Sequence, residues 1–85
     1  MIKRPGDVLD FTVDFSLWLS QGDVIQSHEF IMGNSGLVMD SSVQTATSAV
    51  VWLSGGSKKG KQVIVCKIVT EGQRTKTQPL QIEVL

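Results

Sequence analysis

The most constraining feature of this sequence is a series of short segments in which apolar and polar side chains alternate residue by residue. In the first of them, Leu9, Phe11 and Val13 are separated by aspartate and threonine. Successive side chains of a β-strand point to opposite faces, so this pattern predicts a half-buried antiparallel strand. No segment has the sustained 3.6-residue period of an amphipathic helix, and the pattern therefore predicts an all-β fold.

Turn-forming residues divide the rest of the chain into further strands. We expect strands at 24–32, 37–39, 48–54, 61–70 and 74–84, with the polar segment 40–47 forming a loop or a ragged edge strand. Six to seven short strands at regular spacing predict a single immunoglobulin-like (Ig-like) antiparallel β-sandwich, or a partly open barrel. With 85 residues and no linker, the sequence predicts one domain spanning residues 1–85.

Three places in this pattern predict irregular backbone. Residues 15–19 can either continue the first strand or form a short helical turn. Ile25 differs in parity from Phe30, which predicts a β-bulge near Ser27–Glu29. Pro79 cannot donate a hydrogen bond to a ladder, so we expect it at a sheet edge or a bulge.

Charge and hydropathy exclude two classes of partner. Eight Lys and Arg residues balance eight Asp and Glu residues, so the chain lacks the positive charge of a nucleic-acid-binding protein. The longest apolar runs, 49–53 and 63–66, are too short to span a bilayer. Pro5 and Gly6 stand where the apolar run of a signal peptide would begin. We therefore expect no nucleic-acid or membrane partner, and a protein made in the cytoplasm.

The small size of the chain predicts assembly. Cys66 is the only cysteine, so no intramolecular disulfide can stabilise the domain. A domain of this length buries only about 60–65% of the surface of its unfolded chain. Small domains without disulfides or metals often gain stability from partners or from oligomerisation.

No group of residues predicts an enzyme, a metal site or a cofactor. His28 has no serine or cysteine nucleophile to activate and is expected to be an exposed strand histidine. Cys66 has core parity and is expected to be buried and inert. Asp10 and Asp14 share a strand face, whereas calcium ligands come from a tight turn, so we expect a solvated acidic face.

Two segments are candidate partner contacts. The run Gly55–Lys61 resembles a phosphate-binding loop but lacks the following Ser or Thr and the helix, so we expect a flexible lysine-rich hairpin tip that could grip an acidic partner. Trp18 has the opposite parity to its neighbours and is expected near the surface, as an interface anchor or as a cap on its own core, whereas Trp52 is expected to pack on the core. The candidate contact residues are Trp18, Leu19, Lys58, Lys59 and Lys61.

Blocks of residues along nearly the whole chain resemble the fibre-tail adaptor proteins of tailed bacteriophages. The most specific block is the run Gly6–Phe15 followed by Trp18-Leu19. The other matching blocks are Asp23-Val24-Ile25 with Ser27 and Phe30, Trp52–Gly56, Gly60, Cys66-Lys67-Ile68 and Thr70–Arg74. The chain departs from the family at Phe11 and Phe15, where tyrosine and tryptophan are common, and in its lysine-rich turn.

This resemblance implies a non-enzymatic virion structural protein with an Ig-like fold. Its partners would be other tail, neck or fibre proteins, and it would form a homo-oligomeric ring within the particle after synthesis in the host cytoplasm. Two alternatives are a capsid decoration or head-completion protein and a carbohydrate- or cell-surface-binding module. The second would require exposed aromatic residues in a groove, and the absence of tyrosine argues against it.

Overall fold

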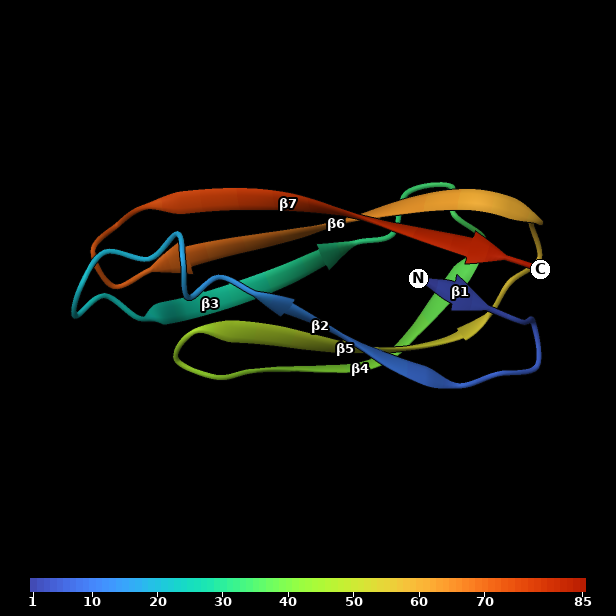
Figure 1. Ribbon diagram of the computed structural model, residues 1–85, viewed down its shortest axis with the longest axis horizontal. Coiled ribbons are helices and arrows are strands. Elements are labelled where there is room, and N and C mark those ends of the chain that lie inside the picture. The colour runs from blue at the N-terminus through green and yellow to red at the C-terminus, as the bar shows by residue number, and fades with distance from the viewer.

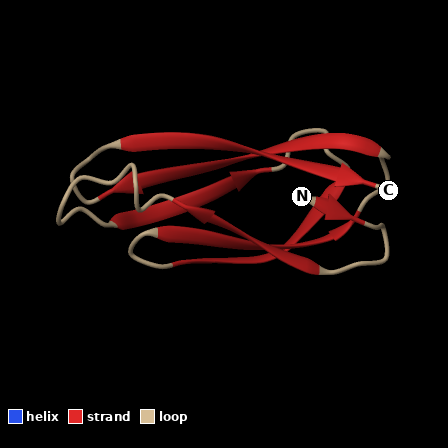
Figure 2. Ribbon diagram, viewed as in Figure 1, coloured by secondary structure: helices blue, strands red, loops and turns tan.

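The computed structural model describes residues 1–85 and consists of strands joined by turns (Figures 1 and 2). The seven strands are β1 (Ile2–Lys3), β2 (Leu9–Asp14), β3 (Ile25–Ile31), β4 (Leu37–Gln44), β5 (Ser48–Gly55), β6 (Gly60–Thr70) and β7 (Thr75–Val84). The all-β prediction is therefore confirmed. The structure contains no helix that could span a membrane.

Two sheets pack face to face, as Figure 1 shows. One sheet has four strands in the order β1-β7-β6-β3, and the other has three in the order β2-β5-β4. All pairs are antiparallel except β1 with β7, which is parallel. Placing the second, fourth and fifth strands in one sheet and the third, sixth and seventh in the other is the arrangement of immunoglobulin domains. The Ig-like sandwich is confirmed, and the barrel alternative is wrong because the two sheets stay separate.

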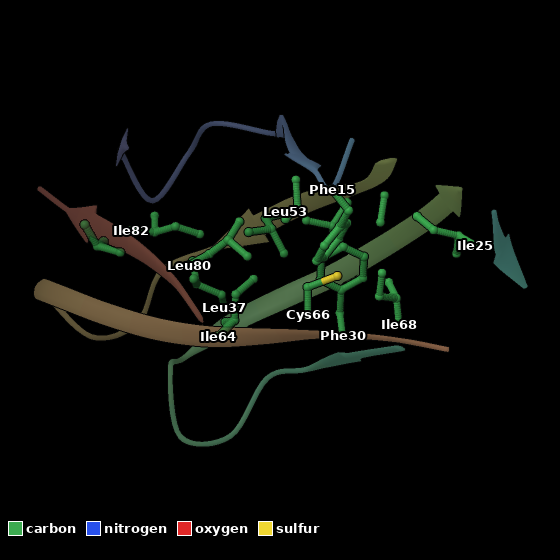
Figure 3. Close-up of a cluster of buried hydrophobic side chains, with 14 residues drawn as sticks. Phe15, Ile25, Phe30, Leu37, Leu53, Ile64, Cys66, Ile68, Leu80 and Ile82 are labelled. Carbon is green, nitrogen blue, oxygen red and sulfur yellow. The ribbon is translucent and has the colours of Figure 1, made fainter. Parts of the chain in front are cut away.

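The core lies between the sheets (Figure 3), and β5, β6 and β7 each contribute alternate residues to it. It contains fourteen buried apolar residues. In β6 the inward residues are Ile64, Cys66 and Ile68, all fully buried, while the odd-numbered residues point outward. Cys66 pairs with Phe30 across β3 and β6. Burial of its thiol raises the pKa of Cys66 to about 11, as expected for an inert core cysteine.

The predicted bulge in β3 exists but lies slightly earlier than expected. The pairing of β3 with β6 shifts between Ile25 and Ser27, so the extra residue is Gln26. This shift puts Ile25 and Phe30 on the same buried face. A second shift, between Met39 and Ser41, makes Asp40 a bulge in β4. Of the two readings of segment 40–47, the irregular edge strand is therefore correct up to Gln44.

Pro79 occupies a free sheet edge, in agreement with its predicted position. The N–H of Glu83 donates to the carbonyl of Met1, at 2.8 Å, so the odd-numbered amides of β7 face away from β6. Because β1 covers only Glu83 and Val84, Pro79 lies on the uncovered part of this edge. Its missing donor therefore removes no hydrogen bond from the sheet.

Two expected positions are wrong. Trp52 lies on the outer face of β5, because Val51 and Leu53 on either side of it take the inward positions. His28 is half-buried rather than exposed, because it stands two residues before Phe30 in a regular part of the ladder and so shares its inward face. Since β3 and β4 are edge strands of different sheets, an inward residue of β3 meets β4 at the side of the sandwich.

His28 joins these two edges through both ring nitrogens. Gln44 donates from Nε2 to the carbonyl of Ile25, at 3.2 Å, which turns its Oε1 toward Nδ1 of His28 at 2.6 Å. An amide oxygen only accepts, so Nδ1 carries the proton. Nε2 lies 2.9 Å from the Ser42 hydroxyl. With the proton on Nδ1, the ring donates to Gln44 and its Nε2 can accept from the Ser42 hydroxyl.

Candidate partner-binding ends of the sandwich

The connections between strands gather at the two ends of an elongated molecule. The principal extents are 40 × 17 × 17 Å. The connections β2–β3, β4–β5 and β6–β7 lie at one end, called here the Trp18 end (Figure 1). The connections β1–β2, β3–β4 and β5–β6 lie at the other, called here the lysine end.

At the Trp18 end, the chain leaves β2 through one helical turn. The amides of Trp18 and Leu19 both donate to the carbonyl of Phe15, at 3.0 Å, while Asp14 accepts from the amide of Ser16 at 2.9 Å. The helical-turn alternative for residues 15–19 is therefore correct. A turn of this kind directs Phe15, Trp18 and Leu19 toward the core and leaves Leu17 outside, fully exposed.

Trp18 is half-buried and contributes to its own end of the core. It packs against the buried cluster, and the guanidinium of Arg74 lies 4.3 Å from its ring centroid. Lys76 Nζ lies 5.8 Å from the same centroid. Cations at these distances interact favourably with the ring face. A hydrogen bond from Arg74 to the Ser20 hydroxyl, at 2.5 Å, holds the guanidinium in place.

Asp23 ties the β2–β3 connection to the β6–β7 turn. Its carboxylate accepts from the amides of Val24 and Gly72, each at 3.0 Å. The pKa of Asp23 lies below 3.8, and the side-chain hydrogen bond with Thr70 is the largest cause. The two amides and the charge of Arg74 also lower the pKa. Burial raises it, but by less than the Thr70 hydrogen bond lowers it. A Cβ on Gly72 would lie 3.0 Å from this carboxylate, so a larger residue there would push the carboxylate away from the turn.

At the lysine end, the β5–β6 tip is tied to the β3–β4 connection. Lys58 donates from Nζ to the carbonyl of Asn34, at 2.7 Å, and the amide of Ser57 donates to the carbonyl of Gly36. Gly36 has a φ of +72°, in the left-handed region that favours glycine. A Cβ at this position would also lie only 2.7 Å from the Ser57 hydroxyl. The tip is therefore hydrogen-bonded to the β3–β4 connection at Ser57 and Lys58.

Lys59, Lys61 and Arg4 carry the exposed positive charge of this end. Lys61 stands opposite Glu83 in the β6–β7 ladder. The lysine end therefore presents two free ammonium groups, with the third, Lys58, engaged by the protein itself.

Lys3 is the unexpected residue beside this tip. It is fully buried, and its Nζ donates to the carbonyls of Gly55, at 2.5 Å, and Arg4, at 2.8 Å. The bond to Gly55 attaches β1 to the end of β5, in the opposite sheet. A lysine near an N-terminus usually stays in water, so nothing in the sequence predicts this position.

The structure divides the predicted contact residues into two groups. Trp18 and Leu19 lie at one end, and Lys58, Lys59 and Lys61 lie at the other (Figure 1). They cannot form a single patch. Leu17 is the surface residue that sequence reasoning missed. A helical turn at residues 15–19 would have predicted its exposure, because it places position 17 opposite positions 15, 18 and 19.

The surface holds no pocket, and no three His, Cys, Asp or Glu side chains are grouped for metal binding.

Comparison with known proteins identifies the family. A comparison with curated protein sequences gives no match. The family model described as podophage GP4 fiber-tail adaptor protein gp77 matches residues 3–83. This match runs from Lys3, in β1, to Glu83, the residue before the last one of β7, and includes both ends of the sandwich. The chain therefore belongs to the podophage fiber-tail adaptor family, as its resemblance to fibre-tail adaptors predicted.

Proposed function

We propose that this protein joins tail or neck components of a podophage to its fibres, using the two ends of the sandwich for two different partners. It acts as a virion structural protein through protein–protein contacts, without catalysis and without a cofactor. The observation that carries the proposal is the separation of the candidate contact residues along a 40 Å axis. A rigid body with unlike ends can hold two partners at a fixed distance and orientation.

The chemistry of the two ends supports different partners. The Trp18 end offers the fully exposed apolar side chain of Leu17 and, over the Trp18 ring, the cations Arg74 and Lys76, which together suit a partner with an apolar socket and acidic residues around it. At the lysine end, the exposed cations Lys59 and Lys61 lie at the β5–β6 tip, and the exposed apolar residue Val8 lies on the separate β1–β2 connection. The tip suits an acidic patch, and its binding should weaken more strongly with salt.

The test uses phage that carry variant copies of the gene. Leu17→Asp alters the Trp18 end, and the double substitution Lys59→Glu/Lys61→Glu alters the lysine end. All three residues are exposed, so the fold should survive. Lys58 is avoided because it makes an internal hydrogen bond. Gln26→Glu, on the side of the sandwich, is the matched control.

Purified particles are then analysed for this protein and for fibres by quantitative mass spectrometry. We expect one end variant to be lost from particles together with the fibres, and the other to remain on particles that lack fibres. The control should resemble the natural phage. Particles with a full complement of both proteins in both variants would contradict the proposal, as would natural particles that lack the protein.

A further inference from the structure

The outer face of the four-stranded sheet carries an apolar row where water-facing residues are expected. Antiparallel pairing aligns Ile31 with Val65 and Val65 with Pro79, and Val63 is the next outward residue of β6. Ile31 is 45% exposed and Val63 is 51% exposed. A solvated sheet face normally alternates with polar residues, so this row indicates a covered surface.

The outer face of the three-stranded sheet carries a second apolar group. Trp52 and Val50 occupy successive outward positions of β5. Val43 pairs with Val50, and Val38 pairs with Ser54 on the same face. Val43 is 49% exposed and Val38 is 54% exposed. The molecule therefore has an apolar group on each of its two opposite flat faces.

The charges of the two faces differ. Strands β2, β4 and β5 contain Asp10, Asp14 and Asp40 and no lysine or arginine. On the other face, the central strand β6 carries Lys61 and Lys67 in outward positions. Their ladder partners there are the acidic residues Glu83 and Glu29. One face is thus purely anionic around its apolar group, whereas the other is neutral with its cations on the central strand.

We infer that copies of this protein stack through unlike faces, with the three-stranded face of one copy covering the four-stranded face of the next. Two three-stranded faces would bring aspartates together without a cation, which disfavours that pairing. The unlike pairing allows Lys61 and Lys67 of one copy to approach the aspartates of its neighbour while the apolar groups meet. A contact between unlike faces repeats from copy to copy and generates a ring or an open stack.

The size of the faces fits such a contact. A face of 40 × 17 Å covers ~700 Å², close to the roughly 800 Å² that each partner contributes to a standard interface. Both ends of the sandwich stay free in this arrangement. The inference deepens the proposed function and depends on it only for the biological setting, because self-association is a property of the isolated chain.

The test measures the mass of the purified full chain by light scattering and sedimentation over a range of concentrations. Val63→Asp disables the four-stranded face, and Val43→Asp disables the three-stranded face. Leu17→Asp is the control, since it makes the same kind of change at an end. We expect the natural chain and the control to form the same oligomers, and each face variant to raise the dissociation constant at least about tenfold, equivalent to about 1.4 kcal/mol.

Mixing the two face variants distinguishes unlike from like contacts. Each variant retains one intact face, and the two intact faces are complementary, so an equimolar mixture should form a one-to-one dimer that neither variant forms alone. Circular dichroism and thermal melting check that both variants remain folded. A natural chain that is monomeric at all concentrations would overturn the inference. A closed dimer that Val43→Asp leaves intact would do so as well, because it would indicate pairing of two four-stranded faces.

Discussion

Gln73 occupies a backbone conformation that usually belongs to glycine. Its φ is +64°, in the left-handed region, and it is the one residue other than glycine with a positive φ. The β6–β7 turn imposes this conformation, because Thr70 accepts from the amide of Gln73 and donates its own amide to the carbonyl of Arg74. The preceding Gly72 is not among the residues with a positive φ, and what constrains it is the close approach of the Asp23 carboxylate.

Replacing Gln73 with glycine should therefore stabilise the protein. A side chain in the left-handed region destabilises the folded state by about 1–2 kcal/mol, and glycine removes this cost. Glycine also makes the unfolded chain more flexible, which offsets the gain by about 0.5–1 kcal/mol. We expect Gln73→Gly to raise the free energy of unfolding by about 0.5–1 kcal/mol, measured by urea denaturation. Gly72→Ala should destabilise the same turn, and a stabilising effect of that change would contradict this description.

Cys66 should be unreactive until the protein unfolds. Its folded pKa of about 11 exceeds the ordinary 9.0, so the folded state holds the thiol proton more tightly than the unfolded state does. Stability from this group is therefore complete below pH 9 and is lost as the pH rises from 9 toward 11. We expect a thiol reagent to label Cys66 only in denaturant, and Cys66→Ala to show a smaller loss of stability over this pH range. Rapid labelling of the folded protein would contradict the buried position.

At the scale of elements, the sandwich is closed along one side by the contact between β3 and β4. His28 spans the two strands, and its ring also meets Phe30 edge-on at 5.8 Å. Replacing the ring with an aliphatic side chain would leave the Oε1 of Gln44 without its partner. An unpaired, partly buried polar group costs about 1–3 kcal/mol.

We therefore expect His28→Leu to lower the free energy of unfolding by about 1–3 kcal/mol in urea denaturation at neutral pH. The double variant His28→Leu/Gln44→Leu should recover part of this loss, because it removes the unpaired amide as well. Equal stabilities of the natural protein and His28→Leu would show that the His28 hydrogen bonds to Gln44 and Ser42 contribute nothing to stability.

The β6–β7 turn should be sensitive to acid through Asp23. The folded-state pKa of Asp23 lies below 3.8, so its stabilising contribution is present above pH 3.8 and is lost as the pH falls through the lower folded value. Asp14 shifts in the same direction, mainly through the amide of Ser16. We expect Asp23→Asn to be less stable than the natural protein at pH 7 and to lose less stability between pH 5 and pH 2. Parallel stability curves for the two proteins would contradict this role.

The elements also show how far sequence reasoning reaches. The strands β2, β6 and β7 follow from alternation, because each buries one face and exposes the other. The two-residue β1 has no alternation to detect, and its pairing with β7 depends on a segment about eighty positions away. The position of the bulge at Gln26 depends on the ladder with β6, so parity alone predicted its existence but misplaced it.

At the scale of the whole molecule, the candidate sites depend on topology more than on motifs. Trp18 and Lys59 were predicted as surface contacts, but only the order of strands places them at opposite ends. Trp52 was assigned to the core, and its outward position is what makes the three-stranded face apolar. Lys3 could not be predicted because its burial depends on the carbonyl of Gly55, a residue in the other sheet.

As a member of the podophage fiber-tail adaptor family, the chain has a structural adaptor role in the virion. Its elongated shape, unlike ends and apolar faces support binding of different partners by different parts of the surface. In the mechanism proposed here, the ends bind two partners, and the faces bind neighbouring copies. Each contact would then use a different part of the surface, so one domain of 85 residues could serve several neighbours at once.

The most direct test of this account is an electron cryomicroscopy map of the podophage tail in which the sandwich is located. We expect the Trp18 end and the lysine end to contact two different protein species, one belonging to the tail or neck and the other to the fibre, with copies touching through their sheet faces. A map in which one end makes all the contacts with other proteins, while the opposite end faces solvent, would contradict the central claim.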